Sequence, residues 1–136
     1  MKRFLLALSL LILAAMPAAA QASTRSVEGR WTNPKRSVVI EVGRCGAAWC
    51  GTVVWATPKA KRNARKGGTE NLIGTRILSG ARPVGNGVYK GRAFVPRRNL
   101  RSSATIRQTG PNTMVVEGCA LAGLLCKEQR WNRVGG

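Results

Sequence analysis

The regular spacing of short β-forming segments limits the fold of this chain more than any other feature of its sequence. From residue 27 onward, runs of β-branched and aromatic residues alternate with turn clusters at intervals of about ten residues, which is typical of all-β barrels and sandwiches. Asn33-Pro34 and Gly85-Asn86-Gly87 are two of these turns. The spacing predicts strands at residues 27–33, 36–44, 51–57, 87–95, 101–107, 113–119 and 127–134. It leaves residues 73–84 open between an eighth strand and a helical turn.

Apolar and polar side chains alternate within the predicted strands. Val38, Ile40 and Val42 share one face of their segment, and Glu41 lies on the opposite face. A sheet with one apolar face buries that face when it closes on itself. The sequence therefore predicts an all-β fold, a small antiparallel up-and-down β-barrel of about eight strands.

Four cysteines lie in two local pairs, and each pair flanks a short turn rich in glycine and alanine. This arrangement predicts that the disulfides Cys45–Cys50 and Cys119–Cys126 each close their own hairpin. Crossed pairs would have to join hairpin tips from opposite ends of the barrel, beyond the reach of a disulfide. Because the chain has no histidine and the cysteine spacing does not suit zinc, no metal site is expected.

The N-terminal segment has the order of a secretory signal peptide. Lys2 and Arg3 precede an apolar run at residues 4–16, and small residues follow at 18–23. We expect residues 1–22 to be cleaved and residues 23–136 to form a single domain, periplasmic or secreted and monomeric. A run of thirteen residues is too short for a transmembrane helix, which needs about 20, so no transmembrane segment is expected.

The chain carries 23 basic and 5 acidic residues, a formal net charge of +18. This balance favours anionic partners such as lipid head groups, acidic polysaccharide or nucleic acid. Residues 59–68 hold the densest cluster and are predicted to be a solvated, mobile loop rather than a specific nucleic-acid site. If residues 73–84 supply a strand, counting strand directions puts Lys35-Arg36, this cluster and Arg97-Arg98 at one barrel mouth, as a rim for an anionic group. The rim candidates are Lys59, Lys61, Arg62, Arg65, Lys66, Arg97 and Arg98.

The residue types that most catalytic sites need are missing. The chain has neither histidine nor aspartate, which excludes Ser-His-Asp and Cys-His arrangements. Glu41 and Glu117 could in principle face each other across a sugar, as a glycosidase requires. Both are expected on the polar faces of their strands, which disfavours this arrangement. The sequence therefore predicts a protein that is not an enzyme and that needs no cofactor.

Aromatic and small residues suggest roles in closing the barrel and in lining it. Trp31 and Trp131 lie in the first and last predicted strands, which become neighbours when a barrel closes, and Arg133 is placed to stack on a tryptophan there. Small residues on the inner faces leave space that a ligand or the tryptophans would fill, and the sequence does not decide between the two. The candidate cavity residues are Trp55, Tyr89, Ala93 and Ala104.

Several ordered motifs resemble one bacterial family, domain of unknown function 2147 (DUF2147), across residues 29–134. These motifs are Gly29-Arg30-Trp31, Arg44-Cys45-Gly46, Trp49-Cys50-Gly51-Thr52-Val53-Val54-Trp55, Leu78-Ser79-Gly80, Gly118-Cys119 and Gln129-Arg130-Trp131-Asn132-Arg133. The resemblance implies a small exported protein with no established activity. Gly-x-Trp near the start and arginine near the end are also similar to lipocalins, which implies a lipocalin-like barrel. Aspartates that the family pattern has are replaced here at Gly68 or Thr69 and at Val95.

Two functional hypotheses follow. In the first, a non-enzymatic periplasmic barrel binds a small apolar or amphipathic ligand inside and meets its anionic group at the basic rim. In the second, a basic interaction protein docks on anionic envelope polymer or on a membrane surface and holds no internal ligand. The volume of the barrel interior distinguishes them.

Overall fold

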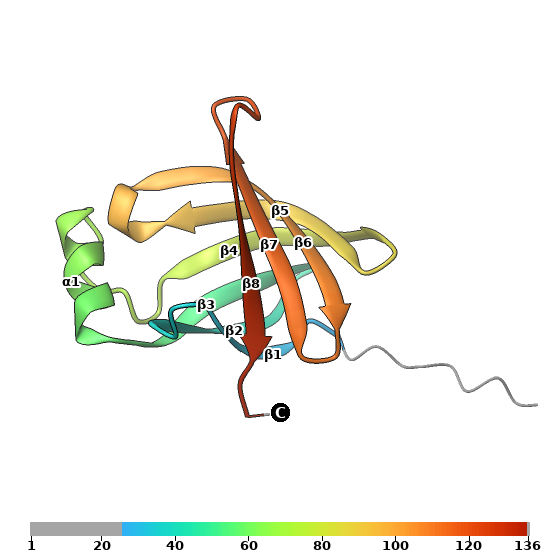
Figure 1. Cartoon of the computed structure of the whole chain (residues 1–136), viewed down its shortest axis with the longest axis horizontal. Coiled ribbons are helices and arrows are strands. Elements are labelled where there is room, and N and C mark those ends of the chain that lie inside the picture. The colour runs from blue at the N-terminus through green and yellow to red at the C-terminus, as the bar shows by residue number, and fades with distance from the viewer. Residues whose placement is uncertain (1–25, 136) are drawn as a thin grey trace, which may run out of the picture.

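The computed structural model describes residues 26–135, and these form a closed antiparallel barrel of eight strands (Figure 1). Each strand pairs with the next along the chain, and β8 returns to pair with β1. A helix, α1, lies between β3 and β4, and a short 3₁₀ helix, η1, lies between β5 and β6. The elements are β1 (Gly29–Thr32), β2 (Val38–Cys45), β3 (Ala48–Ala56), α1 (Pro58–Lys66), β4 (Arg76–Gly85), β5 (Val88–Val95), η1 (Pro96–Arg98), β6 (Leu100–Gly110), β7 (Thr113–Ala120) and β8 (Leu125–Arg133).

The barrel and its topology confirm the predicted all-β fold, and the open segment 73–84 contains the strand β4. Both predicted disulfides, Cys45–Cys50 and Cys119–Cys126, are present. The predicted signal peptide lies outside the described residues. Among residues 26–135, no helix is long and apolar enough to cross a membrane.

The barrel interior is filled by large apolar side chains. Trp31, Met114 and Val53 are almost completely buried, and Trp131 joins the same core. Elsewhere in the core, side chains including Met114 and Trp49 line a cavity of about 10 Å³. A single water molecule needs about 10–15 Å³. Small residues on the inner faces of the strands thus leave no large cavity within residues 26–135, because the tryptophans fill the interior.

Arg133 closes the barrel at the end where the chain enters. Its guanidinium lies 4.3 Å from the centre of the Trp31 ring, and it donates hydrogen bonds to the backbone carbonyls of Ser26, Glu28 and Pro111. The Trp31 indole in turn donates to the carbonyl of Val27, 2.8 Å away. These contacts hold the segment before β1 across the mouth of the barrel, with the Val27 side chain buried in the core.

The predicted mobile loop at 59–68 is wrong, because most of it forms α1. Thr57 caps the helix by accepting a hydrogen bond from the backbone N–H of Ala60 at 3.1 Å, and Pro58 occupies the first turn. One turn apart on the same face, Ala60 and Ala64 pack against the barrel core. The apolar face consists of only two alanines, so the surrounding charges hid it in the sequence.

Candidate functional site

The basic residues gather at the end of the barrel opposite the Arg133 closure. Strand direction places the β1–β2, β3–β4, β5–β6 and β7–β8 connections at this end. There α1 packs against η1, although about thirty residues of chain separate them. We call the seven basic side chains of these two helices the basic cluster: Lys59, Lys61, Arg62, Arg65, Lys66, Arg97 and Arg98.

A glycine allows α1 and η1 to approach this closely. Gly67 ends α1, and a Cβ atom added there would overlap the carbonyl oxygen of Pro96 and the backbone carbonyl of Arg97. Any side chain at residue 67 would therefore push the two helices apart. The positions where the family resemblance implies aspartates, Gly68 or Thr69 and Val95, flank the same contact, and none of them supplies a carboxylate here.

The basic cluster is exposed and lacks acidic neighbours in its own segments. Six of its side chains are exposed and Lys61 is half-buried. Residues 57–69 contain no acidic residue, and the exposed Glu70 is the next residue along the chain. The ion pairs among residues 26–135, Arg30–Glu41 and Arg107–Glu128, lie on the strands away from α1 and η1.

Like charges on α1 oppose its folding. Lys61 and Arg65 lie one turn apart, as do Arg62 and Lys66, and such pairs each destabilise a helix by about 0.2–0.5 kcal/mol. The helix forms because of its cap and its alanine contacts with the core. Arg65 and Lys66 also lie in the last turn, where cations interact favourably with the helix dipole. The fold therefore holds repelling charges together on one surface.

The predicted cavity residues do not share one environment. Ala104 is buried in the core, and the half-buried Tyr89 and Ala93 pack against it. Trp55, in contrast, is 50% exposed because the pairing of β2 with β3 shifts between Val39 and Ile40, next to its partner Val39. The structure thus brings three of the four residues together at the inner wall and leaves Trp55 at the surface.

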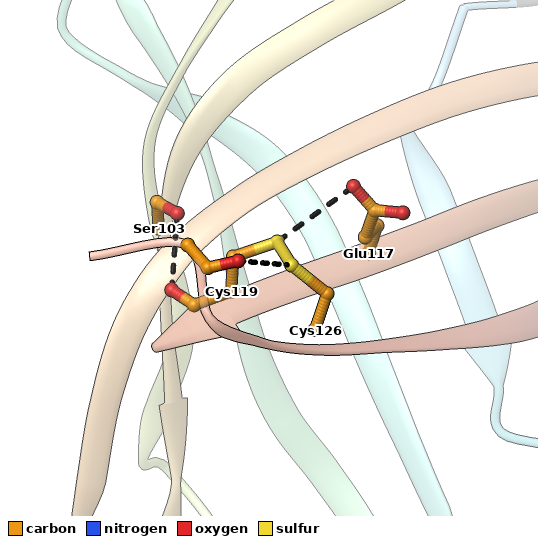
Figure 2. The surroundings of a disulfide bond; sticks show 5 residues. Ser103, Glu117, Cys119 and Cys126 are labelled. Carbon is orange, nitrogen blue, oxygen red and sulfur yellow. Dashed lines mark hydrogen bonds between the residues drawn. A yellow bond between two sulfur atoms is a disulfide. The ribbon is translucent and has the colours of Figure 1, made fainter. Parts of the chain in front are cut away.

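The Cys119–Cys126 disulfide joins directly opposed residues at the neck of the β7–β8 hairpin, where their Cα atoms are 4.1 Å apart. Figure 2 shows the Glu117 carboxylate pointing toward the disulfide, with Oε1 3.8 Å from the Cys119 sulfur. Glu117 and the two sulfurs lie close enough together to suit a metal ion. Because thiolates, not disulfide sulfurs, bind metals, the oxidised site is a structural bridge and not a metal centre.

Replacing Gly67 with alanine should separate α1 from η1 without removing any charge. We expect Gly67→Ala to lower the affinity for dextran sulfate about threefold, because the two halves of the basic cluster would no longer act at one place. Binding titrations measure this effect, and far-ultraviolet circular dichroism checks that the barrel remains folded. Unchanged affinity would show that contact between α1 and η1 does not matter for binding.

The sequence matches a known protein family, and the barrel is similar to a solved structure. A family model described as "Uncharacterized protein conserved in bacteria (DUF2147)" matches residues 29–133. Among solved structures, the protein HP1028 from the human pathogen Helicobacter pylori, described as belonging to the lipocalin family, is similar with a TM-score of 0.66 and 16% identity, covering 82% of this chain and 85% of that chain. At that identity the likeness shows the fold alone. No curated protein matches. Because the family model spans the barrel from β1 to β8, the chain belongs to the DUF2147 family of bacterial proteins.

Proposed function

We propose that this protein is a non-enzymatic binding protein of the periplasm that docks through its basic cluster on an anionic surface or polymer of the cell envelope. The observation that carries the proposal is the packing of α1 against η1, which collects seven basic side chains at one end of the barrel. Two disulfides fit the oxidising compartment in which such a protein would act.

The electrostatics of the cluster support docking. Charges that repel one another within a folded protein are stabilised when an anionic partner lies between them, so binding recovers the free energy that their repulsion costs. Each lysine or arginine near an anionic membrane surface contributes about 1 kcal/mol to binding. Seven such side chains at one end are sufficient for attachment that depends on salt.

A small ligand inside the barrel is the second candidate function. The lipocalin-like fold supports it, and so does the indole N–H of Trp131, which is buried and has no acceptor within residues 26–135. A bound oxygen atom would satisfy that donor. The filled interior weighs against this candidate, because a ligand would need Trp49 or Met114 to move. A native mass spectrum of protein isolated from its own periplasm distinguishes the two, since only an internal ligand would appear as a retained small mass.

The docking proposal predicts a large effect of local charge. Replacing Lys59, Lys61, Arg62, Arg65 and Lys66 with glutamine should lower the affinity for dextran sulfate and for vesicles containing phosphatidylglycerol by at least about tenfold. Wild-type affinity should also fall as salt rises, because the screening length shortens from about 10 Å at 0.1 M salt. The free energy of unfolding should change by less than about 1 kcal/mol, since exposed charges contribute little to stability.

A matched control shows whether affinity depends on where the positive charges lie or only on how many there are. Five exposed basic residues of β4, β5 and β8 can be replaced with glutamine for the same change in net charge: Arg76, Arg82, Lys90, Arg92 and Arg130. This control should keep most of the wild-type affinity. If both variants lose affinity equally, net charge alone drives binding and the basic cluster is not the site.

A further inference from the structure

The tip of the β7–β8 hairpin exposes an apolar surface to solvent. Residues 120–125 contain only alanine, leucine and glycine. Leu121 is 70% exposed, Leu124 is 88% exposed and Leu125 is 44% exposed. Leucine is usually buried, and neighbouring exposed leucines generally mark a surface that contacts something else.

This turn uses residues that its backbone conformation disfavours. Leu121 and Ala122 both have φ of +54°, a left-handed conformation that asparagine and glycine adopt at much lower cost. The β4–β5 turn follows that preference with Asn86 and Gly87. Leucine at the β7–β8 turn therefore serves neither the turn nor the core. Its side chain is available to a partner outside the chain.

The apolar tip is held clear of the barrel. The pairing of β6 with β7 ends at Ser103 and Cys119, so the hairpin extends beyond its neighbour. Figure 1 shows its turn at the top of the molecule, well separated from α1. The disulfide in Figure 2 fixes the neck, with a hydrogen bond from the Ser103 hydroxyl to the Cys119 carbonyl at 3.1 Å. A rigid neck lowers the entropy cost of presenting the leucines.

The two sides of the Cys119–Cys126 disulfide differ in their charged side chains. Lys127 directly follows Cys126, and Arg101 lies exposed on β6, two residues before the last pair with β7. The nearest acidic residues, Glu117 and Glu128, pair across the strands below the disulfide, and Glu128 forms an ion pair with Arg107. The hairpin therefore has an uncharged end beyond the disulfide and basic residues beside it, and its nearest carboxylate, that of Glu117, lies at the disulfide itself.

This arrangement matches a lipid bilayer with anionic head groups better than it matches a protein. Leucines suit the acyl region, and basic residues beside them suit the phosphates. A stable protein interface needs about 20–30 residues on each side, far more than the six of the tip. A second copy of this chain would also bring the same positive charge and be repelled.

We propose that the β7–β8 tip inserts Leu121, Leu124 and Leu125 into the interfacial region of an anionic membrane, up to the level of the Cys119–Cys126 disulfide. This inference rests on the proposed function and names a lipid bilayer as the anionic surface. By strand direction the tip and the basic cluster belong to the same end of the barrel, where Figure 1 shows the tip well separated from α1. The leucines of the tip then give an apolar contribution to binding that salt does not weaken. The basic residues give an electrostatic contribution that salt weakens.

The test compares a tip variant, Leu121→Ser with Leu124→Ser, with the control Val84→Ser, whose side chain is 56% exposed on β4 near the opposite end. The probes are vesicles of phosphatidylglycerol and phosphatidylcholine in equal parts, and dextran sulfate, which has charge but no apolar region. The tip variant should lose about tenfold in vesicle affinity, most clearly at high salt, and keep its affinity for dextran sulfate. The control should match the wild type on both probes.

A second measurement locates the tip directly. Leu124→Trp should show a blue shift and quenching by brominated lipid when vesicles are added, whereas Val84→Trp should show neither. If the tip variant binds vesicles as the wild type does, or Leu124→Trp is not quenched, insertion is wrong while docking stands. If the wild type sediments as a dimer that the tip variant abolishes, the occupant is a second copy and the membrane proposal is wrong. If the wild type binds neither probe, the proposed function itself fails.

Discussion

Trp31→Ala should destabilise the barrel by about 3–5 kcal/mol, which is one of the largest effects that a single substitution can have here. Trp31 has no exposed surface, and its indole donates a hydrogen bond to the carbonyl of Val27. Alanine would leave a cavity in the core and release the segment that covers the mouth. Urea denaturation followed by circular dichroism measures the loss.

Arg133→Ala should cost about 2 kcal/mol or more, because its guanidinium donates hydrogen bonds to three backbone carbonyls and stacks on Trp31. The double variant should be less destabilised than the sum of the two single variants, since each substitution removes the same stacking contact. Arg130→Ala, an exposed arginine of the same strand, is the control and should change stability by less than about 0.5 kcal/mol. Strictly additive effects would mean that the two residues act separately.

The strands and disulfides could be predicted from the sequence because their signals are local. Alternation such as Val38, Ile40 and Val42 reports which face of a strand is buried, and each cysteine pair lies within one hairpin. The helix α1 could not be predicted in the same way. Its stability depends on contacts of Ala60 and Ala64 with a barrel built from distant residues, and its like charges argue for a loop.

The candidate site was predicted only in part for a similar reason. Counting strand directions placed the basic residues at one end, but the direct contact of α1 with η1 depends on Gly67, a residue that the charge pattern does not single out. The β7–β8 tip was missed as a site. Its signal was present in residues 120–125, an uncharged turn that carries leucine where asparagine would suit the backbone better.

Gly91→Ala should also destabilise the barrel strongly, because the backbone of β4 lies very close to this glycine of β5. A Cβ atom at residue 91 would lie 2.6 Å from the carbonyl oxygen of Ser79 and 2.8 Å from the Cα atom of Ala81. Both are backbone atoms, and the pairing of β4 with β5 already shifts between Ser79 and Arg82. Relief therefore requires moving one strand within a closed barrel, and we expect a loss of about 1–3 kcal/mol or more.

Two further glycines make this a graded series. An added Cβ at Gly43 meets nothing within 4 Å, and at Gly51 it would meet the side chains of Leu78 at 3.1 Å and Ile40 at 3.2 Å. None of the three glycines has the left-handed backbone that alanine avoids, so space alone distinguishes them. Thermal denaturation should rank Gly43→Ala near or slightly above the wild type, Gly51→Ala lower and Gly91→Ala lowest. If Gly91→Ala and Gly43→Ala have the same melting temperature, β4 moves easily to accommodate the added methyl group. The tight packing of β4 against β5 would then be wrong.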